Sequence, residues 1–277
     1  MKRKWIRWVS WILLTPIILF VILMVLLYVP PVQNLLRREV TAYASKVTGM
    51  QIQVERIDLR FPLNLLVRGV EVIQQPDTLL SLESLNVRVQ AWPLIKGKVE
   101  VDEVTLSRVA VNSADLMEGM KIKGVLGRFF LQSHGVDLSN ELAVINQVEL
   151  SDTHMQLLMN DTTTTPKDTT ASAPINWKVA LHQLKLKNVS FGMQLPADSM
   201  RMTAHIGEAA INNAQADLKN QYYDLKKFLL SGTSASYDTG TAQPTEGFDA
   251  SHIAVRDIRI ALDSLLYKGR DMNAVIR

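Results

Sequence analysis

VALHQLKLKNVSF, residues 179–191, carries the pattern that decides the fold. Its apolar residues come in pairs two positions apart, and a three-residue step separates each pair from the next. Successive side chains of a β-strand point to opposite faces, so each pair lies on one face of a strand. In a regular strand, a three-residue step would place every later apolar side chain on the opposite face of the sheet. The pattern therefore predicts strands with one apolar face, in which a β-bulge or a tight turn absorbs an extra residue at each step.

Further copies of this pattern follow one another at intervals of about 36 to 44 residues. They begin at Val99, Ala143 and Tyr223, and a last copy begins only 30 residues further on, at Ile253, and then fades. Repeated units of this kind build an elongated architecture. We therefore predict a mainly β fold, an elongated, curled (taco-like) groove built from repeated amphipathic strands. A β-sandwich, in which two such apolar faces meet, satisfies the same pattern and stays open as an alternative.

An uncharged run from Trp8 to Leu36 precedes the strands. Its first part, residues 8–29, is almost wholly apolar, and a bilayer core needs about 20 such residues as a helix. We predict a single transmembrane helix there. Four basic residues within 1–7 favour a cytoplasmic N-terminus, which places the rest of the chain outside the cytoplasm. The residues expected to anchor the helix in the membrane are Trp8, Trp11, Phe20 and Tyr28.

The remaining chain divides at Gly49. Residues 30–48 show three- and four-residue apolar steps and predict a juxtamembrane amphipathic helix. That helix lies in the headgroup layer, packs as a lid on the first strands, or does both. Residues 49–277 form the predicted β-groove, interrupted by a flexible loop at 160–174 that is rich in Thr, Ser and Pro. No capping element follows the last strand-like residues, so we expect this region to be the start of a longer repeat domain.

The sequence contains no recognisable catalytic motif. The chain has no cysteine, its five histidines are scattered, and no glycine-rich phosphate loop or Gly-x-Ser-x-Gly motif is present. The formal net charge is only +3, and basic residues alternate with acidic ones beyond residue 60. We therefore predict a protein that is not an enzyme, with no catalytic residue, metal or cofactor, and that binds no nucleic acid.

A family resemblance rests on several short stretches in order along the first half of the chain. They are YVPPVQNLL at 28–36, TGMQIQV at 48–54, FPLNLL at 61–66, WPLIKG at 92–97 and FFLQSHGVDL at 129–138. Together with the preceding apolar run they resemble the AsmA-like superfamily, and within it TamB-like translocation and assembly module proteins of the Bacteroidetes type.

The resemblance implies a groove that is anchored in the bacterial inner membrane, with its bulk in the periplasm. Such a groove carries phospholipid towards the outer membrane, in support of outer-membrane biogenesis. An alternative is a chaperone-like translocation and assembly factor for outer-membrane β-barrel proteins, and another is a structural envelope tether. A β-barrel partner would dock through a C-terminal part that is absent here. From the strand pattern we expect the lipid-groove lining to include Ile52, Val54, Val99, Val101, Val104, Leu106, Val179, Leu181, Leu184 and Leu186.

Overall fold

A computed structural model describes residues 29–277, except 62, 75, 91, 94–99, 114–118, 138–140, 161–175, 241–244, 270 and 277. The described elements are helix α2 (Pro30–Thr48), a short 3-10 helix η1 (Pro196–Asp198) and eleven strands. The strands are β1 (Gln51–Arg60), β2 (Asn64–Gln74), β3 (Asp77–Val89), β4 (Val101–Asn112), β5 (Met120–Asp137), β6 (Leu142–Met159), β7 (Lys178–Leu195), β8 (Met200–Asp217), β9 (Tyr222–Asp238), β10 (His252–Lys268) and β11 (Asp271–Ile276).

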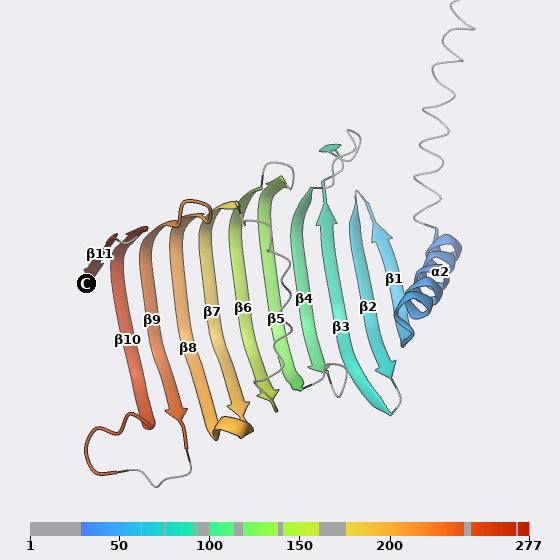
Figure 1. Cartoon of the computed structure of the whole chain (residues 1–277). Coiled ribbons are helices and arrows are strands. Elements are labelled where there is room, and N and C mark those ends of the chain that lie inside the picture. The colour runs from blue at the N-terminus through green and yellow to red at the C-terminus, as the bar shows by residue number, and fades with distance from the viewer. Residues whose placement is uncertain are drawn as a thin grey trace, which may run out of the picture.

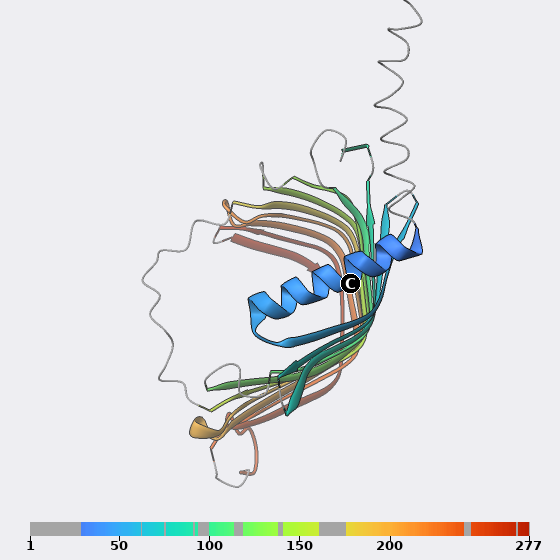
Figure 2. The same cartoon turned by 90° about the vertical axis from the view of Figure 1, so that its right-hand side faces the viewer.

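All eleven strands form one sheet, in which neighbours in sequence are neighbours in space (Figure 1). Every pair is antiparallel except β6 and β7, which run parallel. The sheet curls about an axis that runs from β1 to β11, so that its cross-section is a U (Figure 2). The predicted mainly β, open and curled groove is thus confirmed, and the sandwich alternative is wrong because a single curled sheet leaves its concave side open.

A line of left-handed residues crosses the sheet and explains the three-residue steps. It consists of Gly69, Arg108, Asp152, Asn188, Gly232 and Asp257, all with φ between 47° and 58°, and we call it the bend line. Gly, Asn and Asp tolerate this conformation better than other residues. Where Arg108 takes it instead, its side chain pairs with Glu83 of the neighbouring strand.

In most of the sheet, the extra residue of each three-residue step is accommodated without a β-bulge. On both sides of the bend line the pairing keeps one register, as Leu106 with Phe129 and Val109 with Leu126 show for β4 and β5. Neighbouring strands therefore bend together at one level, and the ladder continues beyond the bend. Between β9 and β10 the register does shift near the bend line, as the bulge interpretation predicts. The aligned bends give the sheet its U shape.

Helix α2 covers the residues for which the sequence predicts an amphipathic helix. Pro30 and Pro31 occupy its first turn, where the missing N–H groups have no helical partner in any case, and Gly49 ends it with φ 71°. The helix lies across the β1 end of the sheet (Figure 2). The Gln33 Nε2 donates to the Leu59 carbonyl at 3.0 Å, and the Arg37 guanidinium donates to the Val54 carbonyl at 3.1 Å.

Within the described part of the chain, no helix has the length and apolar character that crossing a membrane requires. Of the predicted span 8–29, residues 8–28 lie outside the described residues, and with them the anchors Trp8, Trp11, Phe20 and Tyr28 and the basic segment 1–7. Of the predicted flexible loop only Asn160 is described.

Candidate functional site: the apolar trough

The floor of the U carries two apolar rows that run without interruption from β1 to β10. Each row takes one residue from every strand, and each residue is the register partner of the next. The first row is Ile57, Val67, Leu85, Leu106, Phe129, Leu150, Leu186, Ala209, Leu230 and Ile260; the second is Leu59, Leu65, Val87, Val104, Leu131, Val148, Leu184, Ile211, Phe228 and Leu262. We call the concave surface built on these rows the trough.

The walls of the trough are apolar, as its floor is. One wall row runs through Ile52, Val72, Leu80, Val111, Gly124, Met155, Phe191, Ala204, Ala235 and Val255. Neither this row nor the two floor rows contains a charged residue. Within the three-residue step of β7, Lys187 and Asn188 are exposed.

Within the described strands, three buried hydroxyl side chains interrupt the apolar face, and each is bonded to a backbone carbonyl. The Thr153 hydroxyl donates to the Ser151 carbonyl at 3.1 Å, beside the bend line. The Thr233 hydroxyl does the same to the Ser231 carbonyl at 3.4 Å, and the Ser133 hydroxyl donates to the Val101 carbonyl. All three residues are buried. Because the hydroxyls are satisfied internally, they add little polarity to the trough surface.

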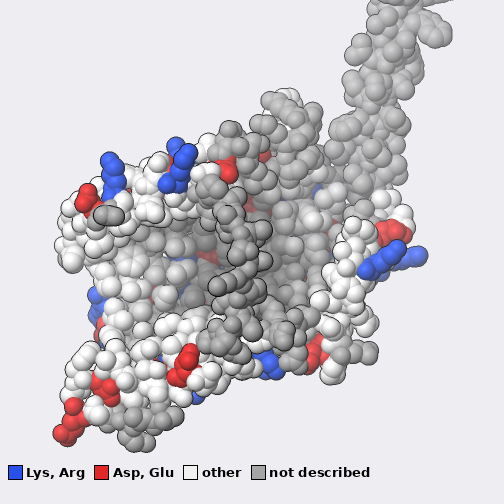
Figure 3. All heavy atoms as spheres, viewed as in Figure 1, with Lys and Arg blue, Asp and Glu red and all other residues white. Residues whose placement is uncertain are grey.

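Burial shows that the apolar face is the concave one. In β7, Leu184 and Leu186 are half-buried, whereas Lys185 and Lys187 between them are exposed. Side chains on the inside of a curled sheet converge and cover one another, and those outside splay apart. Figure 3 looks into the trough and shows charged side chains along its two rims, with a mostly uncharged visible surface between them.

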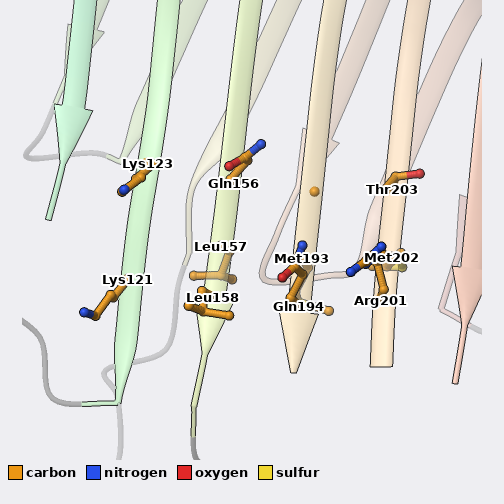
Figure 4. Close-up of a pocket in the computed structure, with 11 residues that line it drawn as sticks. Lys121, Lys123, Gln156, Leu157, Leu158, Met193, Gln194, Arg201, Met202 and Thr203 are labelled. Atoms are coloured by element: carbon orange, nitrogen blue, oxygen red, sulfur yellow. The ribbon is translucent and has the colours of Figure 1, made fainter. Parts of the chain in front are cut away.

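The convex face is shallow and carries charged and polar side chains together with exposed apolar ones such as Val125 and Leu229. Figure 4 shows one depression on it, where Lys123, Gln156 and Thr203 point outward while Met202 lies on the far side of its strand. Ion pairs join neighbouring strands, such as Lys185 with Glu149 at 3.7 Å. Exposed pairs of this kind contribute at most about 1 kcal/mol each. This face therefore supplies solubility and strand pairing.

A short row of polar side chains, His134, Asn146 and His182, crosses three strands at a second three-residue step of the pattern. The side-chain amide of Asn146 lies 3.0 Å from the His134 Nδ1 and 3.3 Å from the His182 Nδ1. Among the described residues, no three His, Asp or Glu side chains lie where they could share a metal ion. These side chains are exposed and join β5, β6 and β7, so we assign them to the pairing of these strands.

Two carboxylates at the sheet margins have lowered pKa values. Backbone N–H groups of Thr245 and Ser251, together with the His252 side chain, lower the pKa of Asp249 from 3.8 to about 2. Hydrogen bonds from the backbone and side chain of Asn220 lower the pKa of Asp217. Both carboxylates fix turns between strands and lie away from the floor rows, so their charge holds loop geometry.

The structure places nine of the ten expected lining residues on the trough surface. Val104, Leu106, Leu184 and Leu186 lie in the floor rows, and the other described ones lie on the walls. Val99 falls outside the described residues. Sequence reasoning missed the contribution of β8, where Ala209 and Ile211 complete the floor, because alanines weaken the apolar pattern there. Read from its C-terminal end, the sequence of β8 shows the same spacing of trough-facing residues as β7, because the two strands are antiparallel.

No protein-family model matches the chain, and no curated protein matches it either.

Proposed function

We propose that the protein holds the acyl chains of phospholipids in the trough and passes lipid between the membranes of a bacterial envelope, without bond chemistry. In this proposal residues 8–29 anchor the chain in the inner membrane, and the trough lies in the periplasm. The supporting observation is the concave face itself, which is continuous across ten strands, open to one side and free of charge in its floor rows.

The dimensions and energetics suit an acyl chain. Nine spacings of about 4.8 Å between the ten strands of the floor rows give a trough about 43 Å long. One leaflet of a bilayer is about 15 Å thick in its hydrocarbon part, so the trough is longer than one lipid. Burying each methylene returns about 0.8 kcal/mol, which offsets the cost of taking the chain out of the bilayer. The charged rims suit a headgroup that stays in water.

A second candidate is a chaperone that pairs with an unfolded β-barrel strand. One observation favours it: β11 pairs with β10 only from Leu262 onward, so residues 252–261 of β10 form a sheet edge without a partner strand among the described residues. Unpaired edges accept extended peptides by β-augmentation. A proline at an edge position of β10 whose N–H points away from β9 should impair this function and leave lipid binding intact.

The deciding experiment is photo-crosslinking in membranes, with the photoreactive residue placed at Leu184 and, in a matched control, at Lys185. These neighbours lie on opposite faces of β7. The proposal expects lipid adducts from Leu184 and far fewer from Lys185. Equal yields from the two positions, or only protein adducts from Leu184, would refute it.

A substitution series sharpens the test. With the photoreactive residue at Ile211, the register partner of Leu184, we compare Leu184→Gln with Lys185→Gln. Both variants introduce the same side chain, one into the floor and one on the convex face. Leu184→Gln should lower lipid adducts several-fold, because it places an unpaired amide in the acyl path, and Leu184→Glu should lower them further. Lys185→Gln should leave the yield unchanged.

A further inference from the structure

Methionine is unevenly distributed over the trough. Of the 11 methionines in the chain, six lie on one wall, at the ends of β5 to β8 that are lowest in Figure 1. One of them belongs to the wall row given above, and the others lie two or four residues from a member of that row, so all six face the trough. We call them the methionine wall: Met120, Met155, Met159, Met193, Met200 and Met202.

The facing wall of the same strands is built differently. Two trough-facing rows cross β6, β7 and β8 there, and neither contains a methionine. An acyl-chain lining needs only apolar surface, which small and branched side chains supply as well. What the methionine wall adds is a cluster of thioether sulfurs. The rows of the facing wall are Ala143, Val179 and Ala216, and Ile145, Leu181 and Ala214.

Met193 of β7 lies at the centre of the methionine wall. Its register partner on β8 is Met202, and Met200 lies two residues from Met202 on the same face. On the other side its partner on β6 is Leu157, two residues before Met159. Direct cross-strand partners have Cβ atoms about 4.5–5.5 Å apart, and diagonal neighbours are about 7–8 Å apart. A methionine side chain has three rotatable bonds, so the three neighbouring sulfurs can converge on that of Met193.

The other two methionines of the wall lie apart from this centre. The Met155 sulfur lies over Gly124 of β5, where an added Cβ would collide with it, so this sulfur is turned away from β7. Met120 is the register partner of Met159 and lies one strand further from the centre. Four thioethers therefore remain, and we call them the ligand set: Met159, Met193, Met200 and Met202.

The surroundings of the ligand set contain no harder metal ligand. All four side chains are half-buried and border the open concave surface. Among the described residues of β5 to β8 that face this wall, none is His, Asp or Glu. His154 and His205 each lie one residue from a trough-facing residue and therefore face the convex side, where His205 is hydrogen-bonded to Ser190 at 2.9 Å. The chain has no cysteine, so its methionines supply its soft sulfur ligands.

We infer that the ligand set binds a soft monovalent metal ion, Cu(I), on the methionine wall. Thioethers are soft, neutral ligands that select Cu(I), whereas Mg²⁺ and Ca²⁺ need the carboxylate and carbonyl oxygens that this wall lacks. An apolar wall also favours a single positive charge, because desolvation of a divalent ion costs more. The inference goes beyond the carriage of lipid and does not depend on it.

The first test follows the methionine methyl groups of the full-length chain by NMR, in phosphatidylcholine nanodiscs and with carbon-13 at the methyl carbons. The probe is one equivalent of Ag(I), which has the charge and closed d shell of Cu(I) and does not change its oxidation state. Ligation shifts the signal of the methyl group beside the sulfur. The four signals of the ligand set should shift together. Those of Met50 and Met272 should stay, although Met272 is 68% exposed and thus more accessible than the ligand set.

The second test measures Cu(I) affinity by competition with a chromophoric chelator, under anaerobic and reducing conditions. Met193→Leu should weaken binding by at least about tenfold, because even removal of a group that only orients a metal ligand typically costs that much. Met272→Leu is the matched control and should leave the affinity unchanged. Leucine conserves the volume of methionine, so neither variant should disturb the sheet. Thioethers do not titrate, and the affinity should therefore be the same at about pH 5 and about pH 8, across the range in which histidine titrates.

Three results would overturn the inference. Without shifts in the ligand set, the methionines serve as apolar lining only. Equal shifts of Met50 and Met272 would show that Ag(I) binds any accessible thioether. An affinity that survives Met193→Leu and is lost as pH falls below about 6.5 would assign the metal to histidines. Lipid adducts at Leu184 are a separate measurement, so this inference and the proposed function stand or fall independently.

Discussion

Replacing Gly127 with alanine tests whether the bend line shapes the sheet. Gly127 of β5 lies opposite the left-handed Asp152 of β6, and the two strands approach closely there. An added Cβ would lie 2.7 Å from the Asp152 Cβ, 2.9 Å from the Asp152 carbonyl oxygen and 3.1 Å from the Ser151 carbonyl oxygen. Two of these three atoms are backbone, so the clash cannot be relieved by a rotamer change.

The expected cost follows from that geometry. Overpacking of a well-packed site typically destabilises by about 1–3 kcal/mol, and contact with backbone places this case in the upper half of that range. In a domain of this size, 1 kcal/mol corresponds to about 2–4 °C in Tm. We therefore expect Gly127→Ala to lower Tm by about 4–12 °C.

Gly192→Ala, in β7 and thus two strands along the sheet, is the matched control. Its Cβ would meet only the Gln156 Cγ, at 4.0 Å. Without a clash, alanine should be neutral or stabilise by up to about 1 kcal/mol, because it restricts the unfolded chain. Thermal and urea unfolding followed by far-UV circular dichroism measure both variants. If Gly127→Ala proves as stable as Gly192→Ala, the close approach at the bend line does not exist and our account of the curvature fails.

The remaining predictions concern α2, the trough surface and one loop. Arg37→Ala removes the charged donor to two β1 carbonyls and should cost about 1.5–3 kcal/mol locally, seen as faster hydrogen exchange in β1 with exchange in β8 unchanged. Thr153→Val removes one internally satisfied hydroxyl and should change unfolding free energy by no more than about 1 kcal/mol, with lipid adducts at Leu184 unchanged; a large loss of adducts would contradict the inert role given to that hydroxyl. A carboxyl NMR titration should give Asp249 a pKa of about 2, below its ordinary 3.8. Because the folded pKa is the lower one, this carboxylate stabilises its loop fully above about pH 4 and loses that effect as pH falls through 2, and a pKa near 3.8 would show that the loop hydrogen bonds are absent in solution.

Sequence reasoning reached the strands, their apolar face and the steps between pairs, because side-chain periodicity is a local property of the chain. It also reached the bounds of α2, since Pro30 and Gly49 are strong local signals. It did not reach the alignment of the bends into one line. That alignment depends on which residues become partners, such as Asp152 with Asn188, and partners in a sheet are set by register between distant segments.

The choice between an open trough and a sandwich was equally beyond the sequence. Both folds need strands with one apolar face, and they differ in whether a second sheet covers it. The side of α2 that faces β1 could not be predicted from the sequence either. Apolar steps in that helix indicate amphipathicity, but they do not say that Arg37 and Ser45, rather than the apolar stripe, face β1.

The parallel pairing of β6 and β7 has a consequence for how the chain folds as it is made. Strands β1 to β6 and β7 to β11 are two meanders of hairpins, and each hairpin can begin from close pairs beside its turn. In the β6–β7 ladder every pair is 36 positions apart, as Leu142 and Lys178 are. At synthesis rates of about 5–20 residues per second, β6 waits about 2 to 7 s for its partner. During that interval it is the growing edge of an apolar sheet, the kind of edge at which chains aggregate. Variants that weaken β7 should therefore reduce the yield of folded protein more than their effect on final stability would suggest.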